Sequence, residues 1–472
     1  MGNKTKIFEF LYKNSETSYN INQLARLVGI SVGSAFKILK EFEEKGYVGA
    51  EKEKKALLYR IKLNNPAKEA YEKLEEEKNS KSKKKTKIIC AISPDSNDIG
   101  FVKKLAYNGM DAALLKTSKY NEKSAMLSVN NIRKASDSIP ILLDIEGKDS
   151  QAMRTWIKFA LKNDIDFISV SFVRDGEDVQ KINRLLGYSG LKEVIGEKIK
   201  VIVKIEEEVL GNYREIIQEA YGIMIDRNCL VSDTKYERFP VLQRLIINDC
   251  NSQGKPAIIA TQMPESMVYA NHPKKFEVSD IANAVLDGAS CLILTNEITE
   301  GKYSIESVKT MSRIIKNVEN ENLANVNYQA SEDFTYFIGN AVLGKEKNLK
   351  IDALLTITSG GYSARMASSK RLKCKVIAAT YSKKIFRQLN LLWGVEPLLV
   401  ESDLEDISNE EKKEAILKAL KNGLIKKSDQ IAILASVFHS KSKRANLLEV
   451  HRVDEFLEYL DKKNKIKISE AR

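Results

Sequence analysis

Eight short runs of β-branched and aliphatic residues lie between residues 86 and 295, and they decide the fold. They read TKIICAI from Thr86, DAALLK from Asp111, PILLD from Pro140, DFISVS from Asp166, KIKVIVK from Lys198, YGIMI from Tyr221, PAIIA from Pro256 and SCLILT from Ser290. A longer segment whose apolar residues recur at helical spacing follows each run. Eight consecutive strand-helix units close most simply into a parallel barrel, so we predict an α/β chain built on a (β/α)8 TIM barrel.

Polar residues stand at the ends of these runs or just after them, at the face of the barrel where active sites are found. They are Lys116, Ser118, Asp144, Ser171, Arg174, Lys204, Glu206, Arg227, Thr261 and Glu297. Any single one could be a solvated loop residue, but the convergence of six or more at one barrel face favours a site.

Seven longer motifs allow a specific comparison of this sequence with known families. In order they are KTKIICAIS, SFVR, VKIE, YGIMIDR, GKPAIIATQMPESM, VSDIANAVLDGAS and GKYSIESVKTMSRI. With this order and spacing, residues from about 85 to 452 resemble the pyruvate kinase family. The resemblance implies a barrel at residues 86–325, a C-terminal α/β effector domain at 326–455, a homo-oligomer (tetramer or dimer), and transfer of phosphate from phosphoenolpyruvate to ADP.

Several site residues follow from this resemblance. Lys204 in VKIE matches the lysine that stabilises the transferring phosphate, and Glu206 matches a metal carboxylate. Thr261 matches the threonine near the proton-transfer step, while Arg174 and Arg227 occupy arginine positions of the family. Phosphoryl transfer depends on such positioning and charge neutralisation.

Other positions depart from the family pattern. Leu114 and Lys116 replace an arginine and an asparagine, so only Ser118 and Asp144 remain of a monovalent-cation cage. Lys116 could place a fixed charge where potassium would bind, which predicts no potassium dependence. Cys229 replaces the second metal carboxylate, and because sulfur is a poor ligand for Mg²⁺ or Mn²⁺, metal binding is expected to be weakened. No cofactor is therefore predicted with certainty, although Asp226 could supply a compensating oxygen.

The segment between Asp144 and Trp156 is only eleven residues long, where the family inserts a whole lid domain. Such lids exclude water and complete the catalytic arrangement. The missing lid, metal ligand and nucleotide arginines predict a module that no longer catalyses phosphoryl transfer.

The C-terminal part contains four further strand-like runs, DALLTIT from Asp352, KVIAAT from Lys375, PLLV from Pro397 and IAILASV from Ile431. The loop after the first run can present backbone amides and hydroxyls to an anion, and in the family the equivalent loop binds an effector phosphate. The predicted effector-binding residues are Thr358, Ser359, Gly360, Gly361, Ser363, Lys441, Lys443 and Arg444. A basic, solvated turn is the alternative for the last three.

Residues 1–65 read as a helix-turn-helix followed by two strands, at Tyr47–Val48 and Leu57–Ile61. Asn22 could cap the second helix, Gly29 could make the turn, and Ser31 could cap the third. The inward stripes are expected to be Ile7, Phe8, Leu11 and Tyr12, then Leu24, Ala25 and Leu27, then Val32, Ala35, Phe36, Leu39 and Phe42. This pattern resembles winged-helix DNA-binding domains.

That resemblance predicts a DNA-binding surface whose lysines meet phosphates. Its residues would be Ser31, Gly33, Ser34, Lys37, Lys40, Lys52, Lys54, Lys55 and Arg60. A winged helix that dimerises or binds protein is the alternative. Residues 66–85 read as a charged linker, and residues 456–472 as a basic tail.

The composition of the whole chain limits the class of protein further. Of the 472 residues, 43% are apolar and 30% are charged, and the net charge is +12. Residues 1–85 hold 19 basic and 12 acidic residues, so the basic excess is concentrated there. The chain has no secretory signal and no apolar run of membrane-spanning length, which predicts a cytoplasmic protein without membrane contact. Its five widely spaced cysteines form no metal or redox pair.

Together these patterns predict a DNA-binding transcriptional regulator whose inactive, pyruvate kinase-like module senses a phosphorylated metabolite. An active pyruvate kinase and a non-catalytic protein-binding scaffold are the two alternatives.

Overall fold

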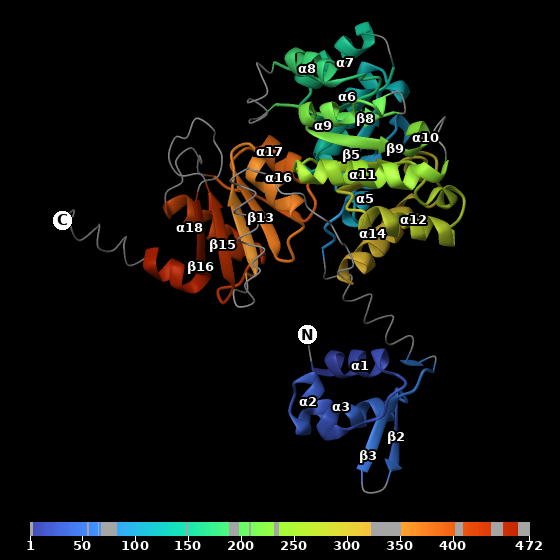
Figure 1. The fold of residues 1–472 in the computed structure, drawn as a ribbon, viewed down its shortest axis with the longest axis vertical. Coiled ribbons are helices and arrows are strands. Elements are labelled where there is room, and N and C mark those ends of the chain that lie inside the picture. Colours follow the sequence, from blue (N-terminus) through green and yellow to red (C-terminus); the bar gives the residue numbers. More distant parts are fainter. Residues whose placement is uncertain are drawn as a thin grey trace, which may run out of the picture. The chain divides into compact units, whose positions relative to one another are not determined.

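The computed structural model divides the chain into two compact units, Met1–Lys83 and Lys84–Arg472 (Figure 1). The residues it describes are 3–53, 56–64, 66–67, 83–147, 150–187, 198–206, 209–230, 236–321, 351–401, 409–435 and 447–460. Within these ranges, no helix combines the length and the apolar character needed to cross a membrane.

Local capping signals set the helices of the first unit, which are α1 (Asn3–Lys13), α2 (Ile21–Val28) and α3 (Val32–Glu44). The predicted cap at Asn22 is wrong, because Asn20 precedes α2 and its side chain accepts a hydrogen bond from the backbone N–H of Gln23. Gly29 ends α2 with a φ of 71°, a conformation that favours glycine. Ser31 caps α3 as predicted, accepting from the Ser34 N–H.

Three antiparallel strands complete this unit. They are β1 (Tyr19–Asn20), β2 (Val48–Glu53) and β3 (Ala56–Ile61), arranged in the order β1-β3-β2. The strand β1 was not predicted, because two residues give no detectable alternation. The helices and the strand pair β2–β3 follow the predicted order, while membership of the winged-helix family stays a prediction.

Part of the predicted core of this unit is wrong. Leu27, Val32 and Phe36 are 53%, 45% and 54% exposed. On α3 the buried stripe consists of Ala35, Ile38, Leu39 and Phe42. Phe36 lies about 100° around the helix from Ala35, so the two cannot face one core equally.

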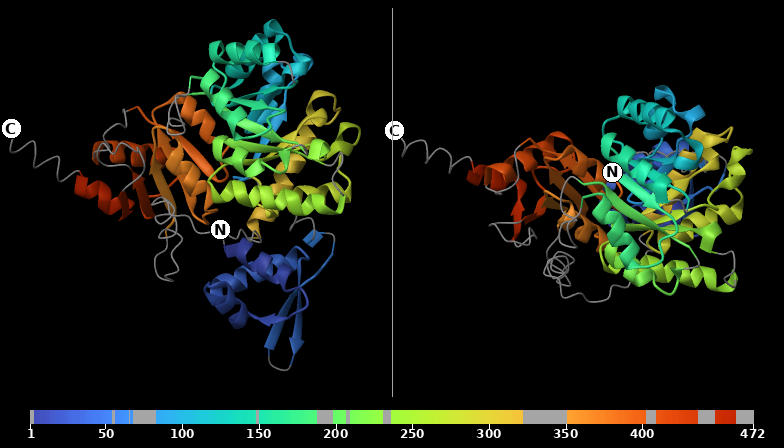
Figure 2. Two further views of the ribbon diagram at one scale, coloured as in Figure 1. Left: turned by 45° about the horizontal axis from the view of Figure 1, so that its top comes forward. Right: turned by 90° about the horizontal axis from the view of Figure 1, so that it is seen from above.

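The second unit begins with the closed barrel, and all eight predicted strands are present (Figure 2). They are β4 (Lys87–Ala91), β5 (Ala112–Lys116), β6 (Ile141–Ile145), β7 (Phe167–Val170), β8 (Lys200–Ile205), β9 (Gly222–Asp226), β10 (Ala257–Ala260) and β11 (Cys291–Leu294). Every neighbouring pair is parallel, and β11 closes onto β4. The predicted barrel is confirmed.

Helices surround the strands, as Figure 2 shows. The longer ones are α5 (Ile99–Tyr107), α6 (Glu122–Ala135), α7 (Ser150–Lys162), α8 (Gly176–Leu185), α9 (Tyr213–Glu219), α11 (Phe239–Ser252), α12 (Lys275–Leu286) and α14 (Ser304–Asn320). Short helices α10 (Arg227–Leu230) and α13 (Asn296–Thr299) directly follow β9 and β11. Since β6 ends at Ile145 and α7 begins at Ser150, the chain has no room there for a lid domain.

The C-terminal part is a five-stranded sheet in the order β14-β13-β12-β15-β16. Its elements are β12 (Ala353–Ile357), α16 (Tyr362–Ser369), β13 (Lys375–Thr380), α17 (Lys383–Leu389), β14 (Val395–Leu399), α18 (Asn409–Lys421), β15 (Gln430–Ala435) and β16 (Leu447–Arg452). Leu354 packs with residues of α16 and α17, and Leu355 with residues of α18, so both sheet faces are covered. This confirms a C-terminal α/β domain. The sequence analysis missed the antiparallel edge strand β16.

Buried contacts join the barrel to this domain. Arg387 of α17 donates from Nε to Asp166 Oδ1 at 2.7 Å and from Nη2 to both carboxylate oxygens of Asp164 at 2.8 Å. The other Asp166 oxygen accepts from Arg133 of α6. Leu391 packs into the side-chain cluster inside the barrel. The C-terminal domain therefore closes the barrel at the end where the strands begin.

Candidate active site

Strand periodicity brings charged residues to the carboxyl ends of three barrel strands, β6, β8 and β9, of which the last two are neighbours. Leu142, Ile202 and Met224 belong to the cluster inside the barrel. Side chains two positions apart share a strand face, so Asp144 and Lys204 also point inward, one step closer to the strand end. The same argument places Asp226, at the end of β9, beside them.

The centre of this group is an ion pair between Lys204 and Asp144. Lys204 Nζ lies 2.8 Å from Asp144 Oδ2, and the side chains are only 7% and 1% exposed. The other Asp144 oxygen accepts a hydrogen bond of 2.6 Å from Ser169 Oγ. The carboxylate is thus fixed on both sides, and it holds the ammonium group in place.

A second carboxylate, Glu146, contacts the same lysine. Its Oε1 lies 3.6 Å from Lys204 Nζ, and its Oε2 accepts a hydrogen bond from Ser118 Oγ. The sequence analysis missed Glu146, because it lies in the connection after β6 and not in a strand. Its only signal was its place two residues after Asp144.

The two residues assigned to a monovalent-cation cage contact other side chains at this face, and the cage itself stays a prediction. Ser118 and Asp144, the two residues assigned to it, bond to Glu146 and Lys204.

The carboxylates keep Lys204 charged. Burial alone would lower its pKa, but the nearby charges of Asp144, Glu146 and Asp226 outweigh burial, and the pKa of Lys204 is raised above the ordinary value. The active face therefore holds a fixed ammonium group in a poorly solvated setting, where it acts strongly on a nearby anion.

Thr261 and Asp226 form a second pair at this face. Thr261 Oγ1 is 3.0 Å from Asp226 Oδ1 and 2.6 Å from the carbonyl oxygen of Ala260. Thr261 has a φ of 66° and Gln262 a φ of 52°, both rare for residues with a side chain. Such strain directly after a barrel strand is typical of functional sites.

Arg227 and Arg174, by contrast, are engaged elsewhere. Arg227 is 4% exposed and donates from Nε to Gln243 Oε1 at 3.1 Å and from Nη1 to the Gln262 carbonyl at 3.2 Å. The side chain of Arg174 is 76% exposed and pairs with Asp178 at 2.9 Å. The structure thus gives Arg227 a role in holding the Gln262 backbone, and it places Arg174 in solvent.

The described side chains supply only part of a binding site for a divalent metal ion. Among the described residues, no three histidine, cysteine or acidic side chains are grouped to hold a metal ion. Glu206 after β8 and Asp226 at the end of β9 offer hard oxygens on adjacent strands. Mg²⁺ commonly takes one or two carboxylates together with substrate phosphates, so this pair fits such a mode. The Cys229 side chain is outside the described part of the chain.

In the C-terminal domain, the predicted effector loop connects β12 to α16. Thr358 Oγ1 accepts from the Gly361 N–H at 2.9 Å, and Ser363 Oγ bonds to Thr356 Oγ1 at 2.8 Å. Gly361 has a φ of 82°. Ser359 and Gly360 lie between them, whereas Lys441, Lys443 and Arg444 fall outside the described residues, so convergence of the two segments stays a prediction.

On the first unit, the predicted DNA-binding residues Gly33, Lys37, Lys40 and Lys52 are exposed. Arg60 is held by Glu16, at 3.0 Å, and by the Ser15 carbonyl, at 2.7 Å. Lys54 and Lys55 are outside the described residues, and contact of this surface with DNA stays a prediction.

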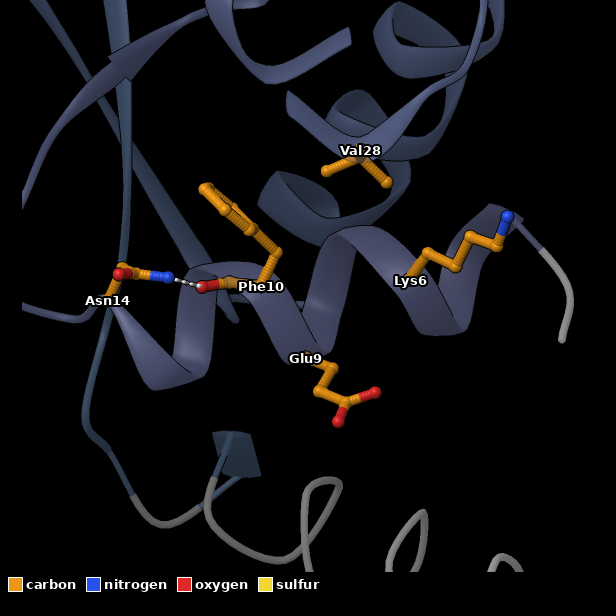
Figure 3. A pocket seen from close by; sticks show the side chains of 5 residues that line it. All are labelled: Lys6, Glu9, Phe10, Asn14 and Val28. Atoms are coloured by element: carbon orange, nitrogen blue, oxygen red, sulfur yellow. Dashed lines mark hydrogen bonds between the residues drawn. The ribbon is translucent and has the colours of Figure 1, made fainter. Parts of the chain in front are cut away.

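A pocket on this unit lies beside α1 and is lined by Lys6, Glu9, Phe10, Asn14 and Val28 (Figure 3). Asn14 Nδ2 donates to the Phe10 carbonyl at 2.8 Å. The charged groups of Lys6 and Glu9 point away from each other in the figure, so the pocket presents no converging catalytic groups.

Comparison with known proteins adds two family matches. Residues 145–308 match the family "Pyruvate kinase, barrel domain", and residues 338–451 match "Pyruvate kinase, alpha/beta domain". The first match covers the strands that carry Lys204, Asp226 and Thr261. The second includes the effector loop.

Individual proteins that are similar to this chain are also named pyruvate kinase. The pyruvate kinase of Clostridium acetobutylicum is 34% identical over 334 residues, which cover 69% of this chain and 67% of that protein. The pyruvate kinase of Geobacillus stearothermophilus is 35% identical, covering 64% of this chain and 52% of its own length. That of Dictyostelium discoideum is 33% identical, covering 64% and 61%. The chain thus spans about half to two thirds of the length of these relatives.

These relatives correct the predicted function. A DNA-binding regulator with an inactive sensor module was the main expectation, and it is wrong: similarity to proteins named pyruvate kinase extends over both domains of the second unit and favours the alternative of an active enzyme. With the Lys204 site, the barrel and the C-terminal sheet agreeing, this chain belongs to the pyruvate kinase family.

Proposed function

We propose that this chain transfers the phosphoryl group of phosphoenolpyruvate to ADP, giving pyruvate and ATP. The observation that carries the proposal is the buried, positively charged Lys204 at the active face of the barrel. Phosphoryl transfer requires little covalent chemistry from the protein, and a fixed cation beside the moving phosphate supplies a large share of the catalysis.

Each described group has a role in this reaction. Lys204 stabilises the negative charge on the transferring phosphoryl group. When the phosphate leaves, the remaining enolate of pyruvate takes up a proton at carbon, and the family resemblance assigns Thr261 to the neighbourhood of that proton transfer. Asp226 orients this hydroxyl through its 3.0 Å hydrogen bond. Arg227 fixes the Gln262 carbonyl and with it the strained turn that carries Thr261.

Glu206 and Asp226 would hold a divalent cation. Bound Mg²⁺ or Mn²⁺ supplies charge neutralisation for phosphate oxygens. A homo-oligomer and a phosphorylated effector at the Thr358 loop belong to the same proposal, supported by the match to the family's α/β domain.

Because the connection between β6 and α7 is short, the test must distinguish transfer of the phosphoryl group to ADP from its hydrolysis by water. A lid excludes water, and without one the phosphoryl group is exposed to hydrolysis as well as to ADP. Purified full-length chain is incubated with phosphoenolpyruvate and Mg²⁺ or Mn²⁺, with and without ADP, and pyruvate, ATP and inorganic phosphate are measured separately. K204M is the inactive control, and K158M, an exposed lysine on α7, is the matched control.

We expect ADP-dependent ATP formation in equal amount to pyruvate, lost in K204M and kept in K158M. Pyruvate that appears with inorganic phosphate and without ATP would identify a phosphatase instead. Absence of pyruvate under all conditions, or equal rates in K204M and the unaltered chain, would refute the proposal.

A further inference from the structure

Glu146 occupies the side of Lys204 that faces solvent. Two carboxylates contact this ammonium group, and they differ in burial: the Asp144 side chain is 1% exposed, whereas that of Glu146 is 31% exposed. Asp144 lies at 2.8 Å from Lys204 Nζ and Glu146 at 3.6 Å. A ligand arriving from solvent therefore meets Glu146 first.

Local contacts hold Glu146 in this position. Its backbone N–H donates to Thr117 Oγ1 at 3.2 Å, and its Oε2 accepts from Ser118 Oγ. The next residue is Gly147, with a φ of 112°, which turns the chain toward α7. Both side-chain partners of Glu146, an ammonium group and a hydroxyl, are groups that also bind a phosphate or a substrate carboxylate.

We propose that Glu146 is an affinity-determining residue, an internal carboxylate that holds Lys204 and Ser118 until an anionic substrate displaces it. The proposal rests on the proposed function for the identity of that substrate, a phosphorylated carboxylic acid. Glu146 and the substrate compete for one cation, so the negative charge of Glu146 weakens substrate binding.

Asp144 cannot play this part. Asp144 is buried, and its second oxygen accepts a hydrogen bond from Ser169. Moving its carboxylate away from Lys204 would leave a buried charge without water or a partner. Displacing Glu146 costs less, because its carboxylate can turn into water and be solvated there.

The test uses E146Q, which removes the charge but keeps an acceptor for Ser118, and E146A, which removes both. The control is E306Q, the same change at an exposed position on α14. Isothermal titration calorimetry measures the Kd for phosphoenolpyruvate, and separately for inorganic phosphate, in the absence of ADP. Steady-state kinetics give KM and kcat, and thermal unfolding confirms that each variant is folded.

We expect E146Q to bind phosphoenolpyruvate about fivefold more tightly than the unaltered chain, the change that loss of a competing ion pair worth about 1 kcal/mol predicts. E146A should bind at least as tightly, and E306Q should bind as the unaltered chain does. KM should fall with kcat nearly unchanged, because Glu146 is displaced before the chemical step and its neutralisation strengthens binding of the substrate and of the transition state alike.

The two proposals fail in different ways. Tighter binding by E146Q without turnover in any variant would uphold the role of Glu146 and refute the kinase reaction. Turnover by the unaltered chain, with an unchanged or higher Kd in E146Q, would uphold the reaction and overturn the role of Glu146. Absence of binding by every variant would also overturn it.

Discussion

Substitution of Lys204 by methionine tests the central ion pair. K204M would leave Asp144, which is 1% exposed, as a buried carboxylate without its cation. At 2.8 Å and an effective dielectric constant of about 20, the attraction between the two charges is about 6 kcal/mol, much of which offsets their desolvation. Removing one partner from such a pair costs about 3 to 5 kcal/mol in the free energy of unfolding.

The double variant K204M/D144N separates stability from chemistry. The asparagine oxygen can still accept from Ser169, and no buried charge remains, so most of the lost stability should return. Phosphoenolpyruvate turnover should stay at least about 10³-fold below that of the unaltered chain in both variants, because each lacks the ammonium group.

Urea unfolding followed by tryptophan fluorescence measures these differences, since Trp156 of α7 packs against the barrel core. K158M on the same helix controls for loss of a lysine. The reasoning is refuted if K204M unfolds at the same urea concentration as K158M, or if the double variant is no more stable than K204M.

Two further predictions concern the other end of the barrel. R387M should lower the free energy of unfolding by about 1.5 to 3 kcal/mol, because Asp166 keeps only Arg133 as a charged partner and Asp164 loses its hydrogen bonds to Arg387. Thermal unfolding checks this against K383M on the same helix, and equal melting temperatures would contradict it. Lys200 is 1% exposed, and burial, followed by the charge of Arg365, lowers its pKa to about 7 from 10.5. Between these two pKa values the unfolded chain holds a proton on Lys200 that the folded chain has released, so the free-energy cost of burying this lysine falls as pH rises. K200M should therefore be more stable than the unaltered chain by at least about 1 kcal/mol at pH 6.5 and lose this advantage by pH 10. A difference in melting temperature between the two proteins that stays the same across that pH range would refute the lowered pKa of Lys200.

Much of the barrel could be predicted from local sequence. Runs such as KIICA and AALLK become strands buried on both sides, and strands of that kind carry a continuous apolar signal. The missed strands, β1 and β16, are a two-residue strand and an edge strand that alternates between partly buried and exposed residues. Their formation depends on the neighbouring strand, which a local pattern does not contain.

The site was predictable only in part. Periodicity placed Lys204 and Asp144 at the same face, but sequence order does not show that β6 and β8 bring the two side chains within 2.8 Å of each other. Arg227 and Arg174 stand at the expected strand ends, but their side chains bond to Gln243 and Asp178.

The predicted regulator failed for a related reason. It gave the missing lid, metal ligand and nucleotide arginines more weight than the matching residues Lys204, Glu206 and Thr261, and the similarity of both domains to pyruvate kinases contradicts that weighting.

The sequence by itself determined where the barrel strands and most of the helices form, since hydrophobic periodicity acts over a few residues. The tertiary structure decided which charges neutralise one another: Lys204 with Asp144 and Glu146, and Arg387 with Asp166. The physical reason is that Coulomb energy and desolvation depend on distance and burial in space, and closure of the barrel sets both for residues 58 or more positions apart.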